Sequence, residues 1–118
     1  MRIITGAGAF TGPEAGFAAD WIEHLRVADL SVGSYSIPAG GTDEQEPHSE
    51  DEIYIVTAGR ATLESGGDRA DVGPGSVLYV PAGEQHRFTS ITEDLATIVV
   101  FAPAEYTNSG TVPSAEAG

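Results

Sequence analysis

Residues 40–59 of this chain read GGTDEQEPHSEDEIYIVTAG, an acidic segment with one histidine that runs into a short apolar strand. Glu46, His48 and Glu52 have the same parity, so on a continuous strand their side chains point to one face of the sheet. Imidazole and carboxylate groups on an inward face are costly to bury unless a cation is present. The segment therefore predicts a cation site inside a β-sheet protein.

The same parity also turns Glu50 inward, which would place too many carboxylates in one pocket. We expect a bulge or turn around residues 49–51 to send Glu50 to solvent instead. An acidic run of this kind is otherwise typical of a solvated loop, and that interpretation remains open for Glu46.

A second segment, residues 75–90, reads GSVLYVPAGEQHRFTS, a strand and a Pro-Ala-Gly turn followed by His86. The turn allows a histidine from a distant part of the chain to enter the same interior as His48. Tyr54 and Phe88 lie two positions beyond Glu52 and His86, so they should face the same cavity. They are predicted either to contact a substrate or to belong to the core.

The rest of the chain carries short apolar runs separated by glycine and proline turns, with almost no helical pattern. The predicted strands are Leu30–Ile37, Ile53–Thr57, Ala61–Glu64, Val77–Val80 and Ala96–Phe101. Such a series predicts an all-β sandwich or barrel. We divide the chain into an N-terminal arm with the first strands (1–28), a barrel (29–103) and a flexible C-terminal tail (104–118).

Composition limits the function classes. The 118 residues are enough for one domain, and a hydrophobic content of 41% is typical of a soluble globular protein. Eighteen acidic against five basic residues give a formal charge of −13, which disfavours nucleic acid and anionic membranes as partners and favours cations. No apolar run approaches the ~20 residues of a membrane span, no cysteine is present, and a cytoplasmic location is expected.

Residues 40–90 resemble the paired motifs of the cupin family. The first motif is a glycine, five residues, His-x-His, three or four residues, a glutamate, six residues and a glycine; the second is a glycine, five residues, Pro-x-Gly, two residues, a histidine, three residues and an asparagine. The matching positions here are Gly40, Glu46-Pro47-His48, Glu52 and Gly59, then Gly75, Pro81-Ala82-Gly83, His86 and Ser90. Two spaced motifs are a far more specific signal than a single short pattern.

The resemblance implies a cupin-type double-stranded β-helix, or jelly-roll barrel, with His48, Glu52 and His86 as metal ligands. Two departures matter: Glu46 stands where the family has a histidine, and Ser90 where it has an asparagine. Glu46 is a candidate fourth ligand or a catalytic general base, whereas Ser90 looks structural. This ligand set suits one divalent ion, Fe(II), Mn(II), Ni(II) or Zn(II), rather than Cu(I).

The fold leaves several functions open. We expect a metal-dependent enzyme of the oxygenase or lyase/isomerase type that acts on a small organic molecule. The alternatives are a non-catalytic small-molecule-binding cupin and a cupin whose metal site is structural or vestigial. Open coordination positions would favour the enzyme, and a closed four-ligand site in a filled barrel would favour a structural metal.

A homodimer is also expected. Residues 53–56 are all apolar and cannot all point inward, so one face of this strand needs a cover. Residues 3–17 and Trp21 precede the motifs and have no obvious place among them. Members of the family commonly lend such N-terminal strands to a partner's sheet, which also covers an exposed edge.

Overall fold

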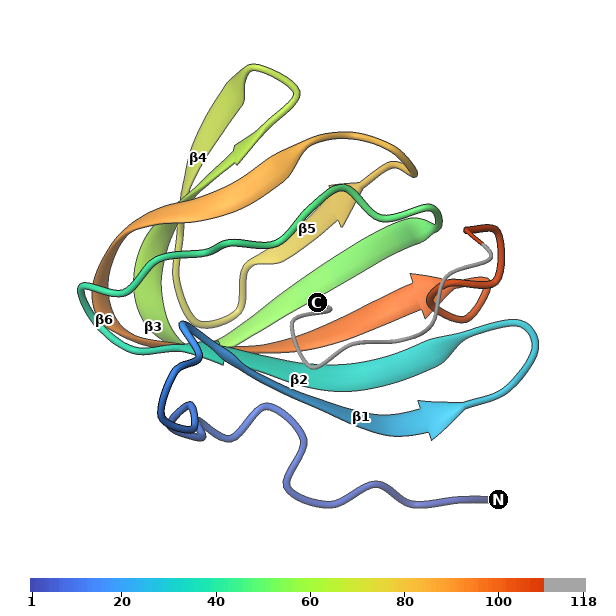
Figure 1. Cartoon of the computed structure of the whole chain (residues 1–118). Coiled ribbons are helices and arrows are strands. Elements are labelled where there is room, and N and C mark those ends of the chain that lie inside the picture. The colour runs from blue at the N-terminus through green and yellow to red at the C-terminus, as the bar shows by residue number, and fades with distance from the viewer. Residues whose placement is uncertain (110–118) are drawn as a thin grey trace.

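The computed structural model describes residues 1–109, in which six strands and no helix are present. The strands are β1 (Asp20–Arg26), β2 (Ser31–Ile37), β3 (Asp51–Ser65), β4 (Asp68–Val72), β5 (Val77–Val80) and β6 (His86–Ala102). They form one antiparallel sheet in the order β1-β2-β6-β3-β4, with β5 paired to β3, and the sheet curls so that β1 and β4 lie at opposite ends (Figure 1). The predicted all-β class is confirmed. Within residues 1–109 no helical segment has the length and hydropathy to cross a membrane.

Strand β3 joins two predicted strands, residues 53–57 and 61–64, into one. Its pairing with β6 shifts register at several points between Val56 and Thr62, and Gly59 in that stretch has a φ of 84°. Such shifts are bulges, which bend a strand and change which residues face inward. The inward parity changes accordingly from even positions before the bulges to odd positions after them.

Strand β6 also bends, so it extends well before the predicted residues 96–101. Phe88 is buried on the first part and Ile91 on the second, and Ser90 between them has a φ of 49°. Asparagine adopts this left-handed conformation more readily than most residues, which explains its place in the family motif. Ser90 therefore has the structural position that the sequence indicated.

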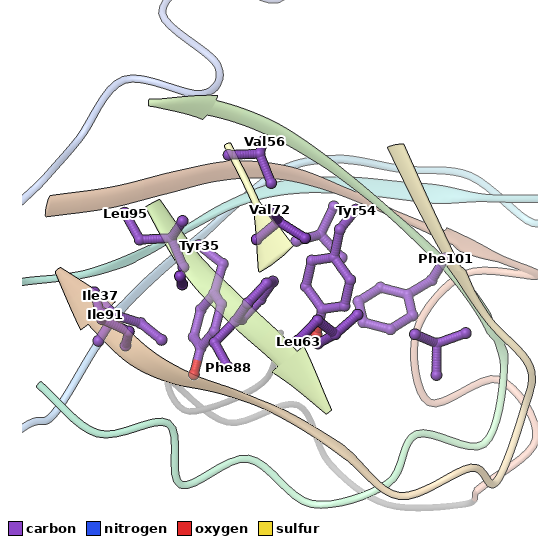
Figure 2. Packing of buried hydrophobic residues seen from close by; sticks show 13 residues of the cluster. Tyr35, Ile37, Tyr54, Val56, Leu63, Val72, Phe88, Ile91, Leu95 and Phe101 are labelled. Carbon is purple, nitrogen blue, oxygen red and sulfur yellow. The ribbon is translucent and has the colours of Figure 1, made fainter. Parts of the chain in front are cut away.

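The core lies inside the curled sheet, where the rings of Tyr54, Phe88 and Phe101 pack among aliphatic side chains (Figure 2). Trp21 of β1 packs edge-on against Phe101, with ring centroids 6.2 Å apart. Gly33 on β2 makes room for it, because a Cβ there would lie 2.2 Å from the indole ring. Trp21 is thus partly buried and packs against the core from β1.

Glu50 was expected in solvent, and this expectation is wrong. Its side chain is buried, and its carboxylate accepts hydrogen bonds from the backbone amides of Tyr106 (2.7 Å) and Asn108 (2.8 Å). The bend at Ser49 and Glu50 does occur, but it turns the carboxylate toward residues 106–108. Bonds to two amides offset part of the cost of burying the charge.

Residues 104–109 were predicted to begin a flexible tail, whereas they pack against the barrel. Ala104 and Glu105 are buried, and the Glu105 amide donates to Ser31 Oγ at 2.9 Å. This segment follows the end of β6, next to the start of β3 (Figure 1). The remainder of the predicted tail, residues 110–118, lies outside the described residues.

Candidate metal centre

Three of the predicted ligands meet inside the barrel. His48 precedes β3, Glu52 is the second residue of β3, and His86 opens β6. One possible ligand atom from each lies within 4.8 Å of the others. Glu52 and His86 are only 1% and 2% exposed, and His48 is nearly as buried. This group can hold a metal ion. It is assembled because Glu52 of β3 pairs with Val80 at the end of β5, and the turn that follows β5 leads directly to His86.

The Glu52 carboxylate shows why a cation belongs here. Neither of its buried oxygens has a hydrogen-bond partner among the described residues. Oε1 lies 3.0 Å from His86 Nε2 and 4.0 Å from His48 Nε2. A buried carboxylate is costly unless positive charge lies beside it, and either a proton on His86 or a metal ion between these atoms would offset that cost.

The tautomer of His86 points to the same conclusion. Its Nδ1 lies 2.9 Å from the carbonyl oxygen of Glu84, which can only accept, so Nδ1 carries a hydrogen. In the neutral ring, Nε2 then presents its lone pair to the Glu52 carboxylate. Burial lowers the pKa of His86, but the contact with Glu52 outweighs burial and leaves the pKa raised. The raised pKa means that positive charge is favoured at His86 Nε2, next to the Glu52 carboxylate, which is where a metal ion would lie.

Gln45 joins the cluster, and sequence analysis missed it. Its Oε1 lies 3.1 Å from His48 Nε2 and 3.2 Å from His86 Nε2, and it accepts a hydrogen bond of 2.9 Å from the Tyr54 hydroxyl. Glu46, the candidate fourth ligand or base, is exposed and lies outside the cluster. Residues 41–48 form no strand, so the parity that pointed Glu46 inward does not apply to them.

Asp43 is a second inward residue of this loop. Its buried carboxylate accepts hydrogen bonds from the Gln45 side-chain amide (2.6 Å), the Tyr35 hydroxyl (2.7 Å) and the Phe88 backbone amide (2.8 Å). The loop is therefore tied to both β2 and β6. In the sequence Asp43 was indistinguishable from its solvated acidic neighbours.

Tyr54 and Phe88 face the interior, as their parity predicted. Both are buried, with ring centroids 4.9 Å apart in a T-shaped contact. The Tyr54 hydroxyl also reaches His86 Nε2 at 3.0 Å. Burial and the negative charges of Glu52 and Asp43 raise the pKa of Tyr54 well above its ordinary value, so the phenol remains a hydrogen-bond donor. Contact with a substrate stays a prediction for both residues.

Glu105 lies on the other side of His48, with its Oε2 3.4 Å from His48 Nδ1. Burial raises the pKa of this carboxyl to about 8, with Glu52, Glu23 and Glu50 adding to the rise and Arg26 opposing it. The sequence carried little sign of this role, because Glu105 lies beyond both motifs in a segment that resembled a tail. A carboxyl beside a ligating histidine is a common means of orienting the ring.

Comparisons with known proteins agree with this fold. A family model described as "Cupin domain" matches residues 33–102. An uncharacterized protein of Streptomyces coelicolor is 48% identical over 85 residues, which cover 72% of this chain and 81% of that protein.

Two solved structures share the fold. An uncharacterized conserved protein of Klebsiella pneumoniae with a double-stranded β-helix domain superposes with a TM-score of 0.73 at 18% identity, covering 87% of this chain and 91% of that one. Salicylate 1,2-dioxygenase of Pseudoaminobacter salicylatoxidans, in complex with gentisate, gives a TM-score of 0.66 at 12% identity, covering 71% of this chain and 25% of that one. At these identities the likeness shows the fold alone, which is the predicted double-stranded β-helix.

Proposed function

The chain belongs to the cupin family, and from this premise we propose that it is a metal-binding protein in which His48, Glu52 and His86 hold one divalent transition-metal ion. The observation that carries this proposal is the Glu52 carboxylate, whose two buried oxygens have no hydrogen-bond partner among residues 1–109 and of which Oε1 lies 3.0 Å from a His86 nitrogen that presents a lone pair. Fe(II), Mn(II), Ni(II) and Zn(II) all suit such a set of imidazole and carboxylate ligands. The predicted cytoplasmic location stays a prediction.

We further propose that the site is catalytic, of the oxygenase or lyase/isomerase type, and acts on a small organic molecule. A divalent ion held there supplies Lewis acidity and a binding position for dioxygen or a substrate oxygen. The chain itself supplies a phenol, Tyr54, whose hydroxyl lies in hydrogen-bond contact with Gln45 and His86 and, by turning from Gln45, can donate to an oxygen on which negative charge develops. A groove of about 390 Å³ between the β3–β4 hairpin and residues 85–87 adjoins His86 from outside and is a candidate entrance.

Nitric oxide provides a test of the catalytic proposal, because it binds Fe(II) only where a coordination position is open. We expect the anaerobic Fe(II)-loaded protein to develop a half-integer-spin EPR signal when nitric oxide is added, since three or four protein ligands do not fill the six positions of an octahedral ion. An EPR spectrum without that signal, from protein with full iron content, would contradict an open site.

The second candidate is a closed site whose ion ties the barrel together. The near-complete burial of Glu52 and His86, and the approach of Gln45 Oε1 to both histidines, favour it. A closed site would show no nitric oxide signal, yet the ion would raise the midpoint of thermal unfolding by mass action. The two candidates are therefore separated by the same experiment.

A homodimer is the expected assembly. On the outer face of the sheet, Val77 and Tyr79 of β5 are 65% and 60% exposed and lie beside Ile55 and Ile53 of β3. An apolar sheet face of this kind is typical of a protein–protein interface. We expect light scattering at low micromolar concentration and moderate salt to give the mass of a dimer, because burial of this face outweighs the repulsion of the screened charge.

Tyr79→Lys tests whether this face forms the interface, and it should give a monomer, because the ammonium group would be buried against apolar residues. A wild-type protein with a monomer mass that does not change as salt is raised would contradict the dimer. Thr92→Lys is a matched control, because this exposed residue lies on β6 away from β5 and should leave the mass unchanged.

A further inference from the structure

We propose that Gln45 is the fourth protein ligand of the metal, through its side-chain oxygen. This inference rests on the proposed metal site and adds to it a residue that neither motif contains. It replaces Glu46 as the group that takes the place of the first histidine of the family. The ligand set becomes two imidazole nitrogens, one carboxylate oxygen and one neutral amide oxygen.

The distances between the candidate ligand atoms support this assignment. Ligands held about 2.1 Å from a common ion lie roughly 3.0 Å apart in octahedral and roughly 3.4 Å apart in tetrahedral geometry. Gln45 Oε1 is 3.1 Å from His48 Nε2 and 3.2 Å from His86 Nε2, and Glu52 Oε1 is 3.0 Å from His86 Nε2. The amide oxygen therefore lies at the spacing expected of one member of the same coordination sphere.

The orientation of the amide is determined by Asp43. Side-chain Nε2 of Gln45 donates to Asp43 Oδ2 at 2.6 Å, and a carboxylate can only accept there. The amide oxygen must then face the opposite way, toward the two histidines. Asp43 also accepts hydrogen bonds from Tyr35 and from the Phe88 amide, so it cannot turn without breaking contacts to two strands.

The loop that carries Gln45 is anchored on both sides. The backbone amide of Gln45 donates to Asp43 Oδ1 at 3.3 Å. The His48 carbonyl oxygen accepts from the Gly83 backbone amide at 2.7 Å. Gln45 is 9% exposed although its neighbour Glu46 is exposed. Gln45 and His48 are thus each held by a backbone hydrogen bond of their own, three residues apart on the same loop.

An excess of acceptors at this point also calls for a cation. Oε1 of Gln45 lies 3.2 Å and Oε1 of Glu52 lies 3.0 Å from Nε2 of His86. The Tyr54 hydroxyl can donate its single hydrogen to only one of Gln45 and His86. A metal ion would satisfy the remaining lone pairs together.

The neighbouring residues Gln45 and Glu46 form a matched pair for the test. Gln45→Leu removes the oxygen and retains the side-chain bulk, and we expect it to weaken Mn(II) binding by about 10- to 100-fold, as the loss of even an outer-shell partner does. Glu46→Leu should leave the Mn(II) affinity within about twofold. The measurement is an EPR titration of free Mn(II) with each metal-free protein.

Water-proton relaxation of the Mn(II)-loaded proteins gives a second readout, which a merely structural role would not change. We expect Gln45→Leu, saturated with Mn(II), to show higher relaxivity than wild type, because water takes the vacated position. Gln45→Asn, which shortens the side chain by one methylene, should behave in the same way if the leucine variant fails to fold.

The outcomes separate this inference from the proposed function. Wild-type protein that binds no Mn(II), Fe(II), Ni(II) or Zn(II) would overturn both. Wild-type binding that Gln45→Leu and Gln45→Asn leave unchanged in affinity and relaxivity would overturn only the role of Gln45. A large loss of affinity in Glu46→Leu with none in Gln45→Leu would restore Glu46 as the fourth ligand.

Discussion

His86→Ala is expected to reduce the metal content of the purified protein to a small fraction of the wild-type value. The substitution removes the ring nitrogen that lies closest to the Glu52 carboxylate, at 3.0 Å, and leaves that buried carboxylate with one histidine nearby. The remaining candidate ligands then all come from one segment of the chain, residues 45–52. The measurement is the metal-to-protein ratio by elemental analysis after dialysis against metal-free buffer.

The third histidine of the chain provides the control. His24 lies on β1, where its Nε2 contacts Ser34 Oγ at 2.7 Å, and it does not belong to the cluster. His24→Ala should therefore retain the wild-type metal content. Full stoichiometric metal in His86→Ala would show that the ion is bound elsewhere in the chain.

Metal content should also depend on pH. Imidazole binds a metal only when it is neutral at the ligating nitrogen, so protons compete with the ion. Because the contact with Glu52 keeps the pKa of His86 above its ordinary value, protonation begins to compete somewhat above the usual histidine range. Binding should be strong near pH 8 and weak below about pH 6.

Gly59→Ala is expected to destabilise the fold by about 3 kcal/mol or more. Gly59 has a φ of 84°, a conformation that costs a non-glycine residue about 1–3 kcal/mol. In addition, a Cβ at this position would lie 2.2 Å from the backbone oxygen of Asp94 on β6, so the strands would have to separate. The free energy of unfolding from urea denaturation of the metal-free protein is the measurement.

Gly75→Ala separates the two causes. Gly75 has a φ of 91° but nothing lies within 4 Å of its hypothetical Cβ, so only the conformational cost of about 1–2 kcal/mol should appear. Equal losses of unfolding free energy in the two variants would mean that the close approach of β3 and β6 at Gly59 adds nothing to the cost of the substitution. Gly59 and Gly75 are both fixed glycines of the cupin motifs. Both need glycine for a positive φ, but only Gly59 also needs it to let the strands approach closely.

The fold was predictable because its signals are local. Glycine and proline turns marked strands such as β5, whose bounds coincide with the prediction. The lengths of β3 and β6 could not be predicted, because the bulges at Gly59 and near Ser90 interrupt the apolar alternation that identifies a strand. A register shift is determined by the partner strand, and the partner is not visible in the sequence of the strand itself.

The candidate site was predictable where the motif spacing determines it, and not where a loop does. His48, Glu52 and His86 lie together because Val80 at the end of β5 pairs with Glu52, and the turn after β5 leads from there to His86. Whether Gln45 or Glu46 points into the barrel depends on how an irregular loop turns. That turn is held by the hydrogen bond from the Phe88 amide to Asp43, two residues that are 45 positions apart in the sequence. The position of Glu105 beside His48 could not be predicted, because it depends on the packing of a segment whose composition resembles a flexible tail.

The most direct measurement is anomalous X-ray scattering from crystals of untagged protein grown without added metal, recorded at the absorption edge of the metal that elemental analysis identifies. We predict one anomalous peak per chain, about 2.0–2.2 Å from His48 Nε2, His86 Nε2 and a carboxylate oxygen of Glu52. A crystal without an anomalous peak among these three side chains, or with its peak at a different place in the chain, would contradict the account.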